Sequence, residues 1–202
     1  MVHNLFPIAA IIASYFLGNI SPAILIGRMM GIDIRKEGSG NAGTTNVLRI
    51  LGKKAAAVTL VIDILKGAAA VLLGGYIGGQ GLALACGIAV LAGHIWPMAF
   101  GFRGGKGIAT AFGIVVTLEP LLGLIEAAIA LTFLLISRRV SVGSIIAAIL
   151  LPVAAYFFNP EYVPWTAAMA VIVLFKHRLN FKRLLKGEEP KVRFSKQEGK
   201  NE

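Results

Sequence analysis

The segment GSGNAGTTNVLR, residues 38–49, combines glycines with side chains that donate hydrogen bonds. Three of its glycines have the G-x-G-x-x-G spacing of a dinucleotide-binding turn. That turn needs a preceding strand and a parallel sheet, whereas a hydrophobic run and a charged linker precede it here. Glycines also let backbone N–H groups approach an anion, and hydroxyl, amide and guanidinium groups add donors. We therefore expect a phosphate cradle rather than a plain flexible loop, with these candidate residues: Gly38, Ser39, Gly40, Asn41, Gly43, Thr44, Thr45, Asn46 and Arg49.

A second segment, GFRGGKGIAT at residues 101–110, surrounds one lysine with the glycines Gly104, Gly105 and Gly107. It differs from a phosphate-binding Walker loop, because phenylalanine replaces the first glycine and Gly107 stands where a serine or threonine would bind magnesium. A lysine that follows a glycine loop and precedes a helix N-terminus is nevertheless well placed to bind phosphate. Lys106 is therefore predicted to be an anion ligand, while Arg103 is expected to serve only membrane topology.

A third polar motif, HRLN at residues 177–180, follows the last hydrophobic run. His177 and Asn180 are three residues apart and would share one face of a helix. His177 could act as a general base or as a hydrogen-bond donor, and the alternative is a polar cap at the membrane edge. Ser141 and Ser144 begin another hydrophobic run, where they either line the same site or cap a helix.

Four ionisable residues fall inside or beside hydrophobic runs, where unpaired charge is costly. Asp63 and Lys66 are three residues apart and are expected to form a structural ion pair. His94 is expected to have a packing or interfacial role. Glu126 has no evident local partner, and the sequence assigns it no role.

The composition sets the environment of these motifs. Of 202 residues, 56% are hydrophobic and 15% are charged, against about 25% charged in a typical soluble domain. This balance predicts an integral membrane protein and makes nucleic acid an implausible partner despite the net charge of +10. The single cysteine, Cys86, excludes an internal disulfide, and the carboxylates form no ladder, so we expect neither a metal site nor a cofactor.

Seven apolar runs predict the spans, at about 5–26, 55–76, 82–100, 107–118, 121–136, 141–158 and 163–175. If all seven cross the membrane and the N-terminus lies outside, every basic residue except Lys66 falls on the inner side. A single helix over 107–136 would instead move Arg138 and Arg139 outside, so we expect a break at Glu119-Pro120. The fourth run reaches only about 18 Å as a helix.

The predicted fold is therefore an all-α integral membrane protein with seven transmembrane helices, the N-terminus outside, the C-terminus inside and a short fourth helix. Residues 1–186 are expected to form the membrane domain. Residues 187–202 are expected to form a charged, disordered cytoplasmic tail, because charged and polar residues dominate them. All three polar motifs then meet on the cytoplasmic side.

The order and length of these motifs resemble the bacterial acyl-phosphate:glycerol-3-phosphate acyltransferase family (PlsY) over nearly the whole chain. The motifs that carry the resemblance are GSGNAGTTNVLR, DILKG, GHIWPMAFGFRGGKGIAT, RRVSVGSI and HRLN. Other glycerolipid acyltransferases share an H-x-x-x-x-D motif. That motif is absent here, because His3, His94 and His177 are followed five residues later by Ile8, Ala99 and Lys182.

The resemblance implies transfer of a fatty acyl group from acyl phosphate to the sn-1 hydroxyl of glycerol 3-phosphate. This reaction gives lysophosphatidic acid and phosphate for phospholipid biosynthesis in the bacterial cytoplasmic membrane. It also implies a soluble partner enzyme that makes the acyl phosphate, and membrane lipid as the surroundings. A small transporter for an organic phosphate is the alternative, but its alternating access predicts polar groups on both faces, and the outer segments have no basic residue.

Under this hypothesis catalysis rests on positioning and charge stabilisation, without a covalent intermediate. Ser39, Arg49 and Lys106 would bind phosphate groups. His177 and Asn180 would orient glycerol 3-phosphate, and the proton acceptor is either His177 or a phosphate of the substrate. The glycines of both loops would give close backbone approach, and the amide and hydroxyl side chains of the first loop would line the cradle.

Overall fold

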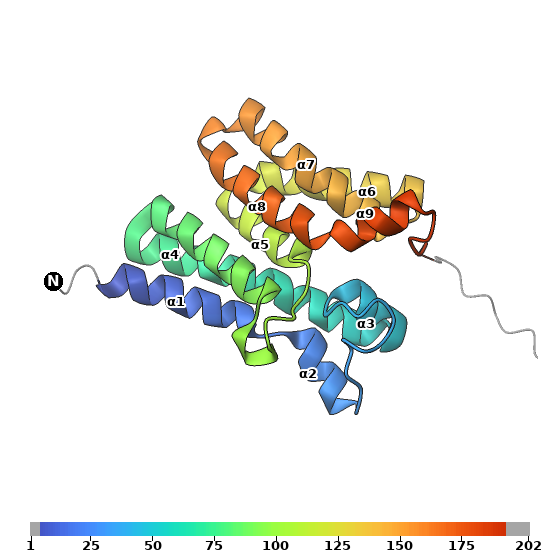
Figure 1. Cartoon of the computed structure of the whole chain (residues 1–202). Coiled ribbons are helices and arrows are strands. Elements are labelled where there is room, and N and C mark those ends of the chain that lie inside the picture. Colours follow the sequence, from blue (N-terminus) through green and yellow to red (C-terminus); the bar gives the residue numbers. More distant parts are fainter. Residues whose placement is uncertain (1–4, 193–202) are drawn as a thin grey trace, which may run out of the picture.

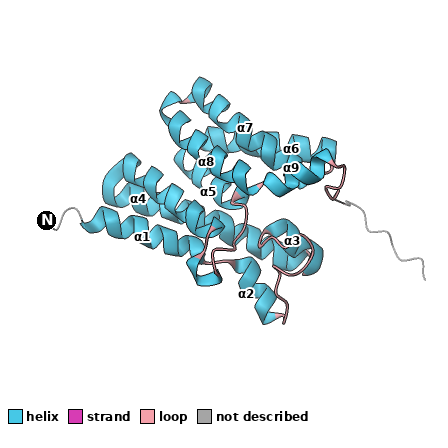
Figure 2. Ribbon diagram, in the orientation of Figure 1, coloured by secondary structure: helices cyan, strands magenta, loops and turns pink. Residues whose placement is uncertain are grey.

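The computed structural model describes residues 5–192, and within this range the chain forms helices and no strand (Figure 2). This confirms the predicted all-helical class. The described elements, in chain order, are α1 (Leu5–Asn19), α2 (Pro22–Met29), α3 (Thr44–Ile50), α4 (Lys53–Ile95), η2 (Met98–Phe100), α5 (Ile108–Leu118), α6 (Pro120–Ser137), α7 (Val140–Phe158), η3 (Pro160–Tyr162), α8 (Val163–Lys176) and α9 (Arg178–Leu185).

Helix α4 is a hairpin of two helical limbs rather than one straight rod (Figure 1). Gly78 and Gly79 leave the helical conformation, and Gly79 has φ 72° and ψ −164°, a backbone that glycine tolerates best. A Cβ on Gly74 would lie 2.7 Å from the Cα of Ala83, so the two limbs pack closely just beyond the turn. The limbs correspond to the second and third apolar runs.

The break at Glu119-Pro120 is confirmed. Helix α5 ends at Leu118 and α6 begins at Pro120, which is tolerated in a first helical turn because its missing N–H would have no partner there. Gly123 packs against Val116, so α6 folds back along α5. The alternative of one helix over 107–136 is therefore wrong. Helix α5, at 11 residues, is about 17 Å long and is short as expected.

Helical segments occupy all seven apolar runs, but only four described segments are long and apolar enough to cross a membrane by length and composition. These segments are Leu5–Met29, Lys53–Phe100, Pro120–Ser137 and Val140–Phe158, and the second one contains both limbs of the α4 hairpin. Large apolar side chains stay exposed along them, as a lipid-facing surface requires. The count of seven crossings and the orientation of the N-terminus remain predictions.

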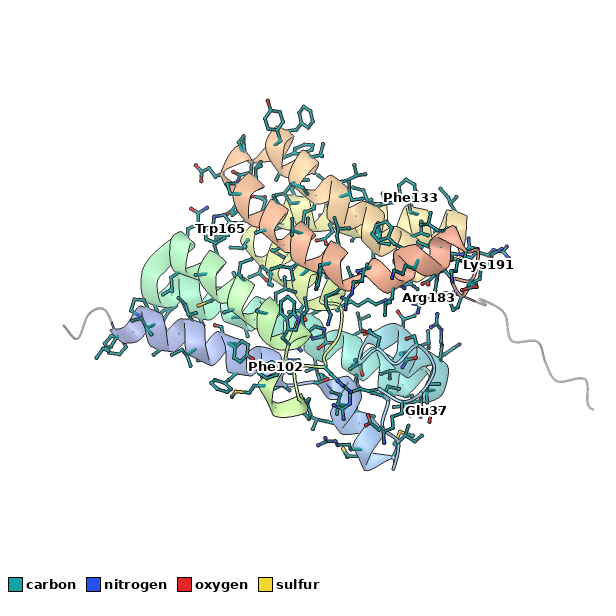
Figure 3. All side chains as sticks on the ribbon, in the orientation of Figure 1. Glu37, Phe102, Phe133, Trp165, Arg183 and Lys191 are labelled. Atoms are coloured by element: carbon teal, nitrogen blue, oxygen red, sulfur yellow. The ribbon has the colours of Figure 1, made fainter. Side chains whose placement is uncertain are left out.

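Close backbone contacts at glycine hold the helices in register. A Cβ on Gly93 would overlap the carbonyl of Tyr15 in α1, one on Gly113 would overlap that of Ile64, and one on Gly143 would overlap that of Ala130. Small residues let membrane helices approach in this way. The resulting bundle gathers α2, α3, α9 and their loops at the end away from residue 5 (Figure 1). Figure 3 places Glu37, Arg183 and Lys191 toward this end and Trp165 toward the other.

Candidate active site

The first glycine loop is built around the buried side chain of Asn46. Its Oδ1 accepts the backbone N–H of Ser39 at 3.0 Å, and its Nδ2 donates to the carbonyls of Ile34 at 3.0 Å and Glu37 at 2.9 Å. Gly38 has φ 56°, and a Cβ there would overlap Asn46 Oδ1. Both residues therefore shape the loop from within and leave the Ser39 side chain exposed.

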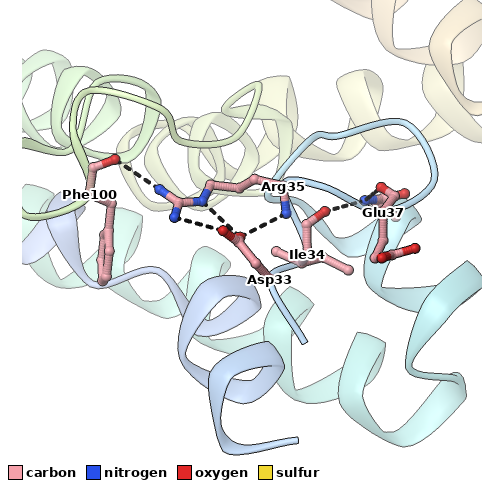
Figure 4. A network of polar contacts seen from close by, with 6 residues as sticks. Asp33, Ile34, Arg35, Glu37 and Phe100 are labelled. Carbon is pink, nitrogen blue, oxygen red and sulfur yellow. Dashed lines mark hydrogen bonds and ion pairs between the residues drawn. The ribbon is translucent and has the colours of Figure 1, made fainter. Parts of the chain in front are cut away.

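An arginine ties the first glycine loop to the segment that leads into the second (Figure 4). Arg35 Nε and Nη2 donate to the two carboxylate oxygens of Asp33 at 2.9 and 3.1 Å, and Nη1 donates to the carbonyl of Phe100 at 3.0 Å. The planar guanidinium reaches both partners at once because its donors form a rigid fork. This contact fixes the spacing between the two polar loops.

Gly104 and Gly105 bring the second loop against the end of α4. Their backbone N–H groups donate to the carbonyls of Ile95 at 3.3 Å and His94 at 3.2 Å. A Cβ on Gly105 would overlap His94 Nε2, and one on Gly104 would overlap the His94 carbonyl oxygen. These two glycines therefore permit close packing of the loop. Gly107, with φ 87°, follows Lys106 and is the N-cap of α5.

A buried polar cluster lies beneath this loop. Lys66 Nζ is 2.7 Å from Asp63 Oδ1 and 2.8 Å from His94 Nδ1, and it also donates to the carbonyl of Ile20 at 2.8 Å. The Asp63–Lys66 pair expected from the sequence is present. The sequence does not predict the contact of this pair with His94, whose Nδ1 lies 3.3 Å from Asp63 Oδ1. Because the His94 ring packs against Gly105, the cluster supports the loop that carries Lys106.

A chain of contacts joins the third motif to Lys106. Lys106 Nζ donates to Asn180 Oδ1, and Asn180 Nδ2 donates to Glu189 Oε1 at 2.6 Å. Glu189 Oε2 accepts from Arg183 Nε at 2.7 Å. Because lysine can only donate and a carboxylate can only accept, these partners fix the orientation of the Asn180 amide. His177 is buried at the junction between α8 and α9, and its Nδ1 lies 2.9 Å from the carbonyl of Val173.

Glu189 belongs to the part of the chain that the sequence predicts to be a free tail. Residues 187–192 instead run back to the α6–α7 turn, where the N–H of Val192 donates to the carbonyl of Arg138 at 2.7 Å. Arg139 Nε also donates to the Glu189 carbonyl at 3.1 Å. Residues 193–202 of the predicted tail lie outside the described residues.

The surroundings shift the pKa values of three groups in this cluster. Burial lowers the pKa of the Lys106 ammonium to about 8, with the attraction of Glu189 only partly opposing it. Burial, together with the charge of Lys106, lowers the pKa of His177 to about 4. Burial by itself raises the pKa of the Glu189 carboxyl, but the neighbouring donor groups of Ser141, Arg183 and Asn180 outweigh it and hold this pKa below its usual value. At neutral pH the site therefore has a charged lysine beside a neutral histidine.

One cavity of about 520 Å³ brings the three motifs together. Thirteen of the seventeen predicted site residues line it: Ser39, Asn41, Gly43, Thr44, Thr45, Asn46, Arg49, Lys106, Gly107, Ser141, Ser144, His177 and Asn180. The other four, Gly38, Gly40, Gly104 and Gly105, are not among the lining residues. Five ionisable residues that the sequence did not assign to the site also line it: Asp63, His94, Glu126, Arg183 and Glu189.

The rest of the wall is apolar, formed mainly by side chains of α4, α5, α6 and α7. Its members are Leu60, Ile64, Ile108, Ala109, Phe112, Ala127, Ala130, Leu134, Val140, Ala147 and Pro190. A compartment with a basic polar head and an apolar body fits an amphiphile that carries phosphate. Across residues 5–192, His, Cys, Asp and Glu side chains nowhere gather in threes that could hold a metal ion.

Comparison with known proteins agrees with this geometry. A family model described as glycerol-3-phosphate acyltransferase matches residues 8–187. Curated proteins named glycerol-3-phosphate acyltransferase include one from Thermoanaerobacter sp. (strain X514), 44% identical over 191 residues that cover 93% of this chain and 96% of its own. Another, from Mesorhizobium japonicum, is 42% identical over 187 residues, with 92% and 95% covered.

Solved structures are also similar. A crystal structure of PlsY (YgiH), an integral membrane glycerol 3-phosphate acyltransferase, in its glycerol 3-phosphate form has a TM-score of 0.89 and 34% sequence identity to this chain. The match covers 93% of this chain and 96% of that one. Its lysophosphatidic acid form has a TM-score of 0.86 and 33% identity, with 93% and 95% covered.

Proposed function

The chain belongs to the glycerol-3-phosphate acyltransferase family, and we propose that it transfers a fatty acyl group from acyl phosphate to the sn-1 hydroxyl of glycerol 3-phosphate. The products are 1-acyl-glycerol 3-phosphate and inorganic phosphate. The observation that carries this proposal is a cavity that Arg49 and Lys106 line together with an apolar wall. A donor with an anionic head and a long apolar chain matches both parts of that cavity.

Both substrates carry a phosphate group, so the site must hold two anions. We assign Ser39, Arg49 and the hydroxyls of the first loop to one phosphate, and Lys106 to the point where the two anions meet. Fixed donors of this kind stabilise charge that develops on the carbonyl and leaving group without reorganising during the reaction. An acyl phosphate already has a good leaving group, so positioning supplies most of the catalysis.

His177 orients the attacking hydroxyl in this scheme. Its Nδ1 lies against the Val173 carbonyl, which can only accept, so Nδ1 carries the proton and Nε2 keeps its lone pair. Because its pKa is about 4, His177 is a weak base at neutral pH. A phosphate monoester has its second pKa near 6 and is the better proton acceptor.

The bond changes then balance without an enzyme-bound intermediate. The sn-1 oxygen forms a bond to the carbonyl carbon, and its proton passes to a phosphate oxygen. The bond between the carbonyl carbon and the bridging oxygen breaks, and phosphate departs with the electron pair. We place this reaction at the cytoplasmic side of the bacterial inner membrane, where the basic loops face a soluble enzyme that supplies acyl phosphate and the apolar wall continues between the helices.

The decisive experiment gives the purified protein glycerol 3-phosphate with either acyl phosphate or acyl-CoA, without added metal, and follows product by mass spectrometry. We expect 1-acyl-glycerol 3-phosphate from acyl phosphate only. Lys106→Ala should lose most of the rate, whereas Arg103→Ala, a matched loss of an exposed cation outside the cavity, should keep it. No product from acyl phosphate, or equal product from acyl-CoA, would refute the proposed donor.

A further inference from the structure

The apolar part of the cavity extends away from the polar loops along four helices. On the four helices that form this wall, the lining residues farthest from the polar loops are Ile64 in α4, Phe112 in α5, Glu126 in α6 and Ala147 in α7. Helix contacts place them at one level. Gly113 packs against Ile64, and Gly143 packs against Ala130, so one turn further along the antiparallel pair Ala147 lies beside Glu126.

Glu126 is the one ionisable member of this innermost layer. Its side chain is buried with 6% exposed, and its Oε2 has no hydrogen-bond partner within the described residues. It lies about 12 Å along α6 from Leu134. Leu134 lines the same wall at the end of α6 that is nearer the polar loops. A buried, unpartnered carboxyl at the far end of an apolar wall is costly unless it serves the ligand or retains water.

We propose that Glu126 sets the longest acyl chain that the cavity accepts, which makes it a specificity residue of the reaction proposed above. A chain that stops short of Glu126 leaves room for water on the carboxyl. A chain whose methyl end reaches Glu126 must displace that water and leave the carboxyl buried against hydrocarbon. The affinity for the acyl chain therefore increases with chain length until the chain reaches Glu126 and decreases for longer chains.

The test is the chain-length profile of kcat/KM for a graded series of saturated acyl phosphates. Glu126→Ala opens space at the end of the wall and should move the cut-off to longer chains. The ratio of kcat/KM for long donors to kcat/KM for short donors should increase about tenfold. Glu126→Leu keeps the volume but removes the carboxyl, and should raise kcat/KM only for chains that just reach this position. KM for glycerol 3-phosphate should stay unchanged in both variants.

Glu119→Ala is the matched control, because Glu119 lies at the N-terminus of α6 outside this cavity, where its Oε2 accepts from Asn159 Nδ2 at 3.3 Å. Its profile should match that of the native chain. If Glu126→Ala fails to fold, Glu126→Leu decides alone. Native-like profiles in the Glu126 variants that fold would overturn the inference while leaving the proposed reaction intact.

A binding series separates this inference from the reaction itself. Lysophosphatidates of graded chain length can be titrated by calorimetry without turnover. A cut-off that moves in Glu126→Ala supports the inference even if acyl phosphate proves to be the wrong donor. Identical cut-offs in the native and variant proteins would refute it whatever the donor is.

Discussion

Lys106 is expected to lose its proton within the pH range of an ordinary assay. Burial lowers the pKa of its ammonium from 10.5 to about 8, a shift worth ~3 kcal/mol. The amine is cationic below this pKa and neutral above it, so binding of an anion should be strong at neutral pH and weaken in alkali. For one essential proton, kcat/KM for glycerol 3-phosphate should be flat between about pH 6.5 and about pH 8 and fall about tenfold per pH unit above it.

Two variants connect this alkaline limb to Lys106. Lys106→Arg replaces the ammonium with a guanidinium that stays charged, so the alkaline limb should disappear below about pH 10 even if the absolute rate is lower. Glu189→Gln removes an attraction that raises the pKa of Lys106, so its limb should move below pH 8. In the complex a bound phosphate favours the charged form, and the limb in kcat should lie at higher pH than the limb in kcat/KM.

The assay measures initial rates of lysophosphatidate formation in detergent between about pH 5 and pH 10. His177, with its pKa at about 4, should contribute no limb near 6.5, and an acid limb near 6 would belong to the second ionisation of glycerol 3-phosphate. A native profile that stays flat to about pH 10, or an alkaline limb that Lys106→Arg leaves in place, would refute the reasoning.

Three further changes test the scaffold of the site. Gly105→Ala would drive its Cβ into a histidine ring and should raise KM for glycerol 3-phosphate about tenfold, whereas Gly81→Ala, which has open space, should match the native kinetics. Asn46→Ala removes three hydrogen bonds and should cost on the order of 3 kcal/mol in thermal unfolding; an unchanged melting temperature would contradict its role in shaping the loop. In intact cells, cysteines replacing Arg103 and Gln80, both exposed, should react with an impermeant maleimide from opposite sides of the membrane, and labelling from one side would contradict the seven-span topology.

The break between α5 and α6 could be predicted because proline dictates it locally. Pro120 cannot continue a helix that began at Ile108, and the two arginines after the next run supply an independent argument from topology. The three polar motifs could be recognised for a similar reason. Glycines beside hydroxyl, amide and cationic side chains have few uses at a membrane surface other than binding an anion.

Long-range contacts could not be read from one sequence. The charged and polar composition around Glu189 indicates disorder. Nothing in the local sequence reveals that the Glu189 carboxylate contacts Asn180 and Arg183. From the sequence, His94 is predicted to have only a packing or interfacial role. Its contacts with Asp63 and Lys66 arise because α4 folds back on itself and places these residues beside the ring. The sequence predicts that Gly105 allows a close backbone approach, but only the fold shows that the neighbouring group is the ring of His94.

The indirect link between Lys106 and Glu189 explains how the site can hold a cation in place and still offer it to a substrate. A carboxylate in direct contact with Lys106 would compete with phosphate for the ammonium group. Asn180 lies between them: its Oδ1 accepts a hydrogen bond from Lys106, and its Nδ2 donates a hydrogen bond to Glu189 Oε1 at 2.6 Å. The amide therefore positions the lysine through a neutral group, while Arg183 balances the charge of Glu189 at 2.7 Å. The charge of Lys106 remains available for a phosphate in the cavity.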